Sequence, residues 1–323
     1  MLSHSGIISY EPTELVVSVR TGTPMIELNR ILAESGQMLP FEPPVLPAST
    51  IGGVLACGLS GPARPFAGSA RDYVLGTRVI NGQGQDLSFG GEVMKNVAGY
   101  DVSRLQVGAY GTLGVLLDVS MKVLPRPEAE LTLVHAATPN DTQSFAALLR
   151  RPLPLSGAML IADRRYLRLS GSEAAVSAAA GVLGGDTLSA DESDIWQRVR
   201  DHEHEFFKPL DGNRRLWRVS VADHAPALDL PGEWLHDWAG AQRWLQSDAS
   251  ADDIQRAAHA NGGHATRYCA GPPGESALQP LEGVMRRLQS RVRDSFDAQR
   301  LFNRGRFHPE LGAVAQTQMA GEG

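Results

Sequence analysis

The sequence is poor in cysteine, with only Cys57 and Cys269 among its 323 residues. Two thiols cannot build a disulfide framework or hold an iron–sulfur cluster, so we expect the reducing cytoplasm as the compartment. The sequence also lacks an apolar run of about 18 residues, the length that spans a bilayer. Its N-terminus shows no basic segment followed by an apolar core, so no signal peptide is expected.

An excess of charge of either sign is missing as well. The chain has 30 Lys and Arg against 36 Asp and Glu, which leaves a net charge of −6. This balance gives no reason to expect binding to nucleic acid or to a membrane surface. The hydrophobic fraction of 42% and the charged fraction of 20% are ordinary for a soluble globular protein, and the length suits two domains.

Three motifs of well-known chemistry are absent. No Gly-Lys-Ser/Thr sequence provides a Walker A loop, and no Gly-x-Ser-x-Gly sequence provides a hydrolase nucleophile. The Gly82-Gln-Gly84 sequence is followed by a strand pattern rather than by a helix, which argues against a Rossmann dinucleotide site. Residues 81–84 are instead expected to form a hairpin turn between the strands 73–80 and 86–89.

Small residues, by contrast, are concentrated in two loops, residues 47–61 and residues 108–115. Backbone N–H groups in such loops are free to converge on an anion such as a pyrophosphate, and hydroxyl groups add donors. The alternatives are a tight connection between strands for the first loop, and a bulge or a strand crossing for the second. The candidate ligand-binding residues are Ser49, Thr50, Ile51, Gly52 and Gly53 in the first loop and Gly111, Thr112, Gly114 and Val115 in the second.

The elements around these loops follow from local patterns. Residues 15–20 are rich in β-branched side chains and predict a strand. Thr23 followed by Pro24 predicts the start of a helix that ends at Gly36. Prolines make residues 41–47 an extended approach to the first loop, and the apolar run 115–124 predicts a buried strand.

The composition shifts at residues 124–127, which we interpret as a domain boundary. Two similar units follow, each with a strand, a helix and a Gly-Gly pair. With a further strand predicted at 216–221, they suit a ferredoxin-like α+β sandwich. The first unit comprises residues 166–169, 172–183 and 184–185, and the second comprises residues 243–246, 252–260 and 262–263.

The histidines do not suggest a bound metal. His202 and His204 are expected on opposite sides of a solvated helix, and His259 and His264 have no cysteine or carboxylate at ligand spacing. His264 and Arg267 enter a predicted strand together, where an imidazole that moves a proton and a guanidinium that grips a carboxylate are one interpretation. The alternative is a structural loop in which Arg267 pairs with an acidic neighbour.

Several segments carry a resemblance to a known family. Residues 47–53, 68–76, 95–101 and 108–115 together resemble the FAD-binding domain of the vanillyl-alcohol-oxidase-type flavoproteins, a PCMH-type domain. Further segments make the chain similar, over nearly its whole length, to the flavin-binding subunits of bacterial glycolate-oxidising complexes. These segments are residues 10–15, 89–101, 121–127, 229–233 and 262–267.

The resemblance implies an α+β fold in two parts. Residues 1–127 are expected to form the PCMH-type FAD-binding domain, and residues 128–323 a ferredoxin-like α+β cap domain on the substrate side. The C-terminal segment is expected to return to the flavin domain. The resemblance also implies FAD as the cofactor, adds Gly68 and Ser69 to the cofactor-binding residues, and leaves His264 and Arg267 as the candidate catalytic pair.

The same resemblance implies a function. It is the oxidation of glycolate to glyoxylate, in a complex with a larger FAD-linked subunit and an iron–sulfur subunit that passes electrons to an acceptor other than NAD. The chain is then expected in the cytoplasm, at the inner membrane only through its partners. Two alternatives stay open: a non-catalytic structural subunit of that complex, and a stand-alone flavin-dependent 2-hydroxy-acid dehydrogenase.

The sequence departs from the family pattern at three places. It begins at about the strand that follows the family's first βαβ segment, so we expect an FAD-binding domain without that segment. Residues 109–111 read Ala-Tyr-Gly where many relatives have Ser-Glu-Gly, and residues 303–306 read Asn-Arg-Gly-Arg where the family has Asn-Pro-Gly-Arg. Each departure bears on how the cofactor is held.

Overall fold

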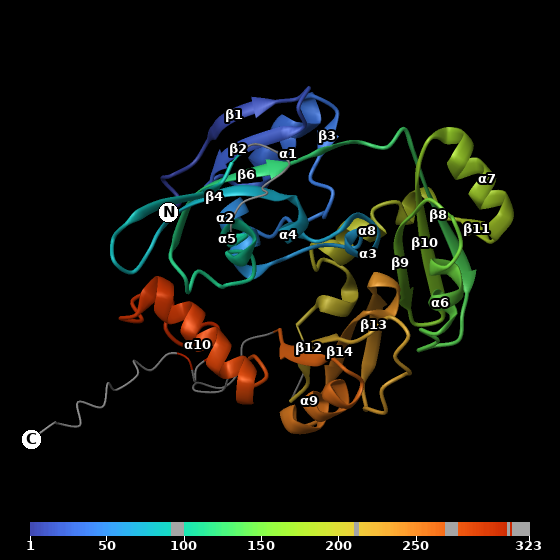
Figure 1. Ribbon diagram of the computed structural model, residues 1–323. Coiled ribbons are helices and arrows are strands. Elements are labelled where there is room, and N and C mark those ends of the chain that lie inside the picture. The colour runs from blue at the N-terminus through green and yellow to red at the C-terminus, as the bar shows by residue number, and fades with distance from the viewer. Residues whose placement is uncertain (92–99, 210–212, 269–276, 309–310, 312–323) are drawn as a thin grey trace, which may run out of the picture.

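The computed structural model describes residues 1–91, 100–209, 213–268, 277–308 and 311. Cys269 and the family-motif residues 95–99 lie outside these ranges. Two antiparallel sheets dominate the described part, one built by the N-terminal third of the chain and one by the middle (Figure 1). Among the described residues, no helix is long and apolar enough to cross a membrane.

The first sheet has five strands in the order β1-β2-β6-β4-β5. Alternating or continuous apolar side chains explain each strand, and the predicted strands and the hairpin turn are confirmed. One face of the sheet buries an apolar core with Val17, Leu28, Ile51 and Met121 at its centre. The strands are β1 (Ile7–Glu11), β2 (Val16–Arg20), β4 (Val74–Ile80), β5 (Asp86–Gly90) and β6 (Val115–Lys122), beside the small pair β3 (Gln37–Met38) and β7 (Leu124–Pro125).

The predicted helix after the second strand is confirmed as α1 (Met25–Glu34), but its start is one residue later than expected. Pro24 occupies the N-cap, and no side chain caps the helix. The Thr23 hydroxyl is used elsewhere, because it donates to the Arg20 carbonyl and accepts from the Gly6 N–H. The prediction of Thr23 as the cap was therefore wrong.

The first small-residue loop is in part a helix, α2 (Ile51–Cys57). Thr50 caps it by accepting the Gly53 N–H at 3.2 Å, and Gly58 ends it with φ of 65°. Ile51, Val54 and Leu55 are buried at helical spacing. This apolar period explains why the segment winds into a helix despite its two glycines.

The second sheet has eight strands in the order β11-β8-β10-β9-β13-β14-β12-β15. It consists of two four-stranded halves, joined where β13 pairs with β9. The two predicted strand–helix units are confirmed as β10 with α7 and β14 with α9. The strands are β8 (Ala129–Ala136), β9 (Leu155–Ile161), β10 (Arg164–Gly171), β11 (Asp186–Thr187), β12 (Arg215–Ser220), β13 (Glu233–Asp237), β14 (Gln242–Ser247) and β15 (His264–Arg267).

Helices cover the sheets and the junction between them. The longer ones on the second sheet are α7 (Glu173–Leu183) and α9 (Ala251–Ala260). The shorter ones are α3 (Arg64–Ala67), α4 (Ala70–Tyr73), α5 (Val102–Leu105), α6 (Ser144–Leu149) and α8 (Ile195–Arg200), with 3₁₀ turns at Ala190–Glu192, Glu205–Phe207 and Trp238–Gly240.

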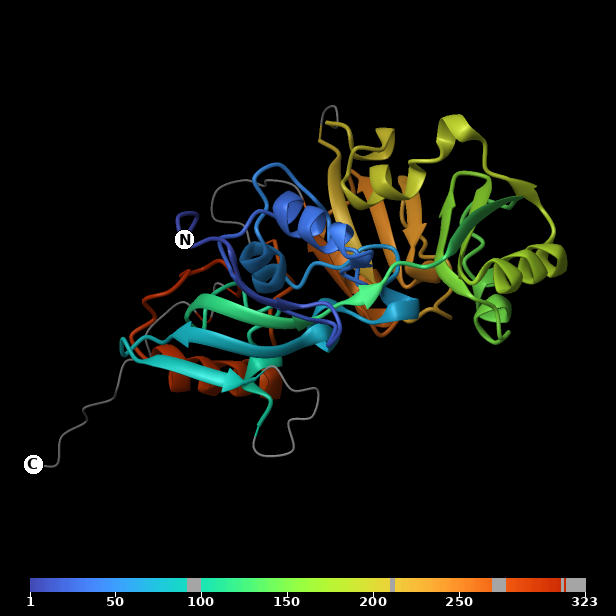
Figure 2. The ribbon, with the colours of Figure 1, turned by 90° about the horizontal axis from the view of Figure 1, so that it is seen from above.

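The last helix, α10 (Gly283–Asp297), lies against the first sheet rather than the second. The Gly82 N–H donates to the Phe296 carbonyl at 2.8 Å, and the Phe89 ring meets the Phe296 ring edge-on. In the view of Figure 2, the first sheet lies between α1 and α2 on one side and α10 on the other. The C-terminal part of the chain therefore contacts the same sheet as its beginning.

Candidate functional site

A cleft of about 1390 Å³ opens between the two sheets and the C-terminal segment. Cys57 and Gly58 at the end of α2, together with Ser69, form its wall on the side of the first sheet. Strands β12 and β15 form the opposite wall, and residues 306–308 close a third side. Its volume exceeds the 300–1,000 Å³ typical of a site for one small molecule.

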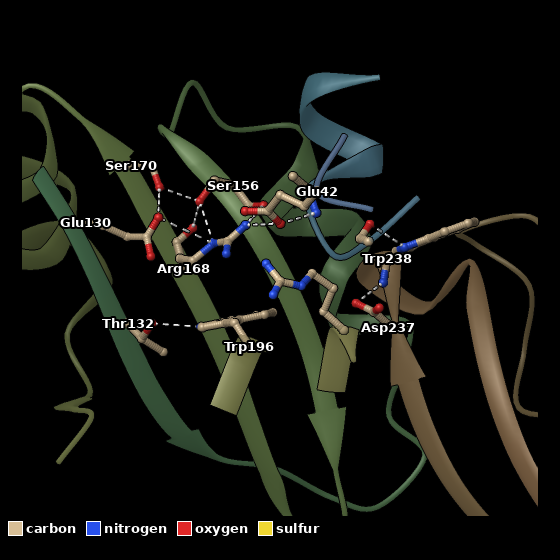
Figure 3. Close-up of polar contacts among 12 residues, drawn as sticks. Glu42, Glu130, Thr132, Ser156, Arg168, Ser170, Trp196, Asp237 and Trp238 are labelled. Atoms are coloured by element: carbon tan, nitrogen blue, oxygen red, sulfur yellow. Dashed lines mark hydrogen bonds and ion pairs between the residues drawn. The ribbon is translucent and has the colours of Figure 1, made fainter. Parts of the chain in front are cut away.

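Polar contacts across the junction fix the two walls of the cleft. The Arg168 guanidinium on β10 forms an ion pair with Glu42, Nη2 to Oε2 2.8 Å (Figure 3). The Asp201 carboxylate accepts the Val45 N–H at 2.7 Å. The indole of Trp238 donates to the Gly61 carbonyl at 2.9 Å. These three links place side chains of the second sheet at fixed positions against residues 42–61.

The Arg168–Glu42 pair is buried and well provided with hydrogen bonds. Arg168 is 6% exposed, and it also donates to the Ser156 hydroxyl and carbonyl, both at 3.0 Å. The guanidinium lies 5.0 Å from the Trp196 ring, and the Trp196 indole donates to Thr132 (Figure 3). A buried ion pair with its remaining donors satisfied costs much to break from one side.

The expected nest of free N–H groups at residues 49–53 is not formed. The N–H groups of Ile51 and Gly52 donate to the carbonyls of Thr23 and Thr21, and that of Gly53 donates to the Thr50 hydroxyl. The reason is the helix start at Ile51, which lies against the turn after β2. The Ser49 hydroxyl is buried and has no partner among the described residues. A role in phosphate binding stays a prediction, which now rests on hydroxyl groups.

The second glycine loop is packed against the chain itself. A side chain on Gly114 would lie 2.5 Å from a Val79 methyl, and one on Gly111 would lie 2.8 Å from the Asn303 amide. Thr112 is buried and donates to the Ala109 carbonyl, and Val115 pairs within the sheet. The cleft itself is bordered by the neighbouring Val107, Gly108 and Tyr110 rather than by Gly111, Thr112, Gly114 or Val115.

Two of the three departures from the family pattern meet in space. The Asn303 amide donates to the Tyr110 carbonyl at 2.6 Å, and the Tyr110 ring stacks on Phe307 at 5.4 Å. Tyr110 has φ of 54° and Asn303 has φ of 40°, conformations that non-glycine residues rarely adopt. The contact ties the C-terminal segment to the rim of the cleft.

Residues 68 and 69 lie at the start of α4. Ser69 borders the cleft, and its N–H and hydroxyl both donate to Asp72 at 2.8 Å. Gly68 has φ of 104° and packs near Asp72. Ser69 therefore borders the cleft, Gly68 forms the turn before it, and their role in cofactor binding stays a prediction.

His264 and Arg267 both border the cleft, but from different faces of β15. Side chains alternate along a strand, and β15 pairs with β12 so that His264 lies opposite Ser220 and Arg267 lies opposite Trp217. His264 is exposed, whereas Arg267 is 6% exposed. Burial, and then the charge of Arg218, lower the pKa of His264. The side chains of His264 and Arg267 therefore project from opposite faces of β15 rather than toward each other.

The arginine on the same sheet face as His264 is Arg218 of β12. Arg218 was not among the residues predicted for the site. By the same alternation Arg218, Ser220, His264 and Thr266 line one face, and all four border the cleft. The signal was present, because residues 217–221 alternate apolar and polar side chains in a strand that was predicted. A strand with one polar face beside a cleft is where a charged ligand-binding side chain is expected.

Two tyrosines, Tyr268 and Tyr110, lie near enough to Arg218 to act on its pKa. Burial lowers its pKa, the charges of Tyr268 and Tyr110 act in the opposite direction, and Arg64 lowers it further. Burial raises the pKa of Tyr268 to about 12. The Arg218 Nε donates to the Gln242 side chain at 2.7 Å. The floor of the cleft is thus a cation among phenols, a setting that suits an anionic ligand.

The prediction for His202 and His204 was wrong. They follow α8 rather than lying on a solvated helix, and His204 caps the next 3₁₀ turn by accepting the Phe206 N–H. The His202 ring packs against Phe207, Trp244 and Tyr268, with ring centroids 4.7 to 5.1 Å apart. Burial lowers the pKa of His202 to about 4, so this imidazole is a neutral part of the packing.

Comparisons with known proteins agree with this architecture. Residues 1–90 match a family model described as an FAD binding domain. The chain is 48% identical over 310 residues to the glycolate oxidase subunit GlcE of Escherichia coli (strain K12), a match that covers 95% of this chain and 86% of that one. It is 34% identical over 128 residues to the glycolate oxidase subunit GlcD of Bacillus subtilis (strain 168), over 40% of this chain and 27% of that one.

A solved structure shares the fold. It is an alkyldihydroxyacetonephosphate synthase, with a TM-score of 0.61 at 14% identity. The superposition covers 93% of this chain and 65% of that one. The likeness shows that both halves of the chain, and not only the FAD-domain match, follow one known α+β arrangement.

Proposed function

This chain belongs to the family of the glycolate oxidase subunit GlcE, and we propose that it is the FAD-binding subunit of a glycolate oxidase complex that converts glycolate to glyoxylate. The observation that carries the proposal is 48% identity over 95% of the chain. The cleft between the two sheets supports it, since its volume is sufficient for a cofactor and a small substrate together.

The residues around the cleft fit FAD. A side chain at Gly108 would meet nothing within 4 Å, and Gly58 packs against Gly108, so this wall is open to a flat ring system. Six arginines border the cleft, and we propose that two of them, Arg71 and Arg306, offer positive charge to a diphosphate. When bound, FAD supplies the acceptor for the two electrons of the substrate.

The protein's own residues position the substrate and take up its proton. We propose that His264, exposed to the cleft and with a lowered pKa, takes the hydroxyl proton of the substrate in its neutral form. Of the two roles open to Arg267, its place on the opposite face of β15 favours the structural one. The Ser49 and Thr50 hydroxyls are the proposed donors to the cofactor, and Ser69 is proposed to contact it at the cleft wall, since its own N–H and hydroxyl donate to Asp72.

The absorbance of the purified protein tests this function. We expect flavin bands that bleach when glycolate is added to the complex without an electron acceptor. Replacing Gly53 with Leu should lower the flavin content, because Gly53 is exposed beside Thr50. Gly181→Leu is the matched control, since Gly181 also lies in a helix with open space around it. Full flavin content in Gly53→Leu would remove this helix start from the cofactor site.

A structural subunit of the same complex is the second candidate. The internal pairing of the N–H groups at residues 51–53 favours it, because it leaves few free donors for a diphosphate there. A folded, colourless chain that copurifies with a larger FAD-linked subunit and an iron–sulfur subunit would support this candidate. Flavin that stays with the isolated chain and bleaches when glycolate is added would exclude it.

The partners and the location follow from the same proposal. We propose a larger FAD-linked subunit and an iron–sulfur subunit as partners, with electrons passed to an acceptor other than NAD. The complex would work in the cytoplasm and reach the inner membrane through the partners. Copurification of an affinity-tagged chain, with iron and flavin determined in the product, tests this assembly.

A further inference from the structure

Two arginines from different parts of the chain gather on one indole at the floor of the cleft. The Arg64 guanidinium lies 4.3 Å from the centroid of the Trp238 ring, and that of Arg218 lies 5.2 Å from it. Arg64 begins α3 beside the first sheet, whereas Arg218 lies on β12 of the second. All three residues border the cleft.

The Trp238 indole is held in place by the backbone conformation of residues 238–239 and by a hydrogen bond. Trp238 and Ala239 have φ of 52° and 53°, two consecutive left-handed residues without glycine. Such a conformation costs free energy and persists only where the surroundings require it. The Trp238 N–H donates to Asp237, and its indole donates to the Gly61 carbonyl. The ring is therefore a fixed platform for both guanidinium groups.

Burial lowers the pKa of both arginines, and Asp72 acts in the opposite direction on Arg64 as Asp237 does on Arg218, but among the described residues neither guanidinium forms a close ion pair. Within the part of the chain that the structure describes, no ion pair involves Arg64 or Arg218. Among the described residues, the side-chain hydrogen bond of Arg218 goes to the neutral Gln242. After burial, the charge of Arg64 also lowers the pKa of Arg218, since like charges repel. A half-buried and an exposed guanidinium held by the same indole offer positive charge to a shared anion.

We propose that Arg64 and Arg218, held by Trp238, form a binding site for the carboxylate of the 2-hydroxy acid. The assignment rests on the proposed function. Two planar guanidinium groups match the two oxygens of a carboxylate. His264 lies on the same face as Arg218, so a carboxylate bound there would bring its neighbouring hydroxyl group toward the imidazole. The cofactor diphosphate is the other oxyanion that this chemistry would accept.

Oxalate is the probe that separates the two oxyanions, because it carries the carboxylate and has no C–H bond to oxidise. Binding is measured by calorimetry on the purified protein, with its flavin content determined in parallel. We expect Arg218→Gln and Arg64→Gln each to weaken oxalate binding about 10- to 100-fold with an unchanged flavin content. Arg64 is exposed at the start of a short helix, so its variant keeps the test valid if Arg218→Gln folds poorly.

Arg256 provides the matched control. It borders the same cleft, but it is 72% exposed and paired with Asp253 on α9. Arg256→Gln should change oxalate affinity by less than about twofold, since exposed pairs contribute little. Equal losses in all three variants would overturn the site, because they would report only the general positive field of the cleft.

Two further results would overturn the proposal. The first is a wild-type protein that binds no oxalate. The second is a lower flavin content in Arg64→Gln and Arg218→Gln with oxalate affinity retained in the loaded fraction, which would assign the pair to the diphosphate. Failure of the proposed function looks different. A colourless wild-type protein that does not oxidise glycolate, yet binds oxalate through these two arginines, would refute the enzyme and keep the site.

Discussion

The two sheets that form the cleft bury different kinds of side chain. In the described part of residues 1–127, every buried polar side chain is uncharged, and the core is a continuous apolar cluster. The second sheet buries several groups that carry or can gain a charge, and the C-terminal segment adds more. These groups are Arg168, His204, His236, Asp237, Arg243 and Arg267, followed by Arg293, Asp297, Arg300 and His308.

This difference in buried charge suggests that the two walls of the cleft have different roles. The part of the chain with the first sheet contributes mainly shape, because small and apolar residues such as Cys57, Gly58 and Gly108 border the cleft there, beside the exposed Arg64 and Arg71. The second sheet contributes fixed charge, and it has the hydrogen bonds to hold it. Arg243, fully buried, donates to the carbonyls of Gly240, Ala225 and Pro226 and has no carboxylate partner in the described part of the chain. We interpret a charge that is buried at a cost in stability as one that fixes the orientation of the surrounding segments.

The largest effect is expected from the ion pair between the walls. Arg168→Ala leaves the Glu42 carboxylate buried without its cation, and we expect a loss of about 3–5 kcal/mol in the free energy of unfolding. Arg164→Ala is the matched control, because its pair with Glu192 is 43% and 34% exposed and such pairs are worth about 1 kcal/mol or less. Urea unfolding measures both. Equal losses would mean that buried charge has no special role in the second sheet.

The pH dependence of the free energy of unfolding tests one buried acid of the second sheet, Asp237. Burial raises the pKa of Asp237 to about 7, against about 3.9 in an unfolded chain. The folded state therefore binds the proton more tightly, and the stability due to Asp237 is present below pH 4 and is lost as the pH rises through 7. We expect Asp237→Asn to match the wild type near pH 4 and to be about 2–4 kcal/mol more stable at pH 8.

The comparison between the variant and the wild type is essential in that experiment. Burial lowers the pKa of His236 to about 3 and that of His202 to about 4. These histidines act in the opposite direction, because their stability contribution is lost as the pH falls below about 6.5. They remain in both proteins, so the difference reports Asp237. A difference that does not change between pH 4 and pH 8 would show that the Asp237 carboxyl titrates normally.

Gly52 and Gly53, which are adjacent in α2, differ in how closely they pack against the first part of the chain. A side chain on Gly52 would lie 2.6 Å from the Thr21 Cβ, whereas one on Gly53 meets only the Thr50 hydroxyl at 3.6 Å. We expect Gly52→Ala to cost about 1–3 kcal/mol through overpacking and Gly53→Ala to gain about 0.5–1 kcal/mol in a helix. Thermal unfolding measures both. Similar changes in the two variants would contradict the close packing of α2 on the turn after β2.

The smallest effect is expected at Arg267. Arg267→Lys keeps the charge and loses the guanidinium fork, and the side chain lies on the strand face opposite His264. We expect the apparent Michaelis constant for glycolate of the complex to stay within about twofold of the wild type. A rise of tenfold or more, with normal assembly, would move substrate binding from Arg218 to Arg267.

Much of the fold was accessible from the sequence, because apolar alternation and turn residues are local signals. The strands 15–20, 73–80 and 115–124 and both strand–helix units follow from them. The helix at Ile51 was missed because two glycines outweighed the apolar spacing of Ile51, Val54 and Leu55. Local propensity is overridden there by burial against the sheet.

The site was predictable only in part. His264, Arg267 and Ser69 do border the cleft, and they came from motifs. Arg64 and Arg218 lie 154 positions apart in the sequence and meet only because Trp238 is held at the junction of the two parts. Contacts between distant segments leave no local pattern. The alternation of residues 217–221 indicated a polar face but not what it faces.

The most direct test of the account is the flavin stoichiometry of the purified protein, because the cleft between the two walls is interpreted as a cofactor site. Absorbance in the flavin bands, compared with protein concentration after addition of FAD and removal of the excess, gives the number directly. We expect about one FAD per chain. A folded protein that retains no flavin would contradict it and leave the cleft with another occupant.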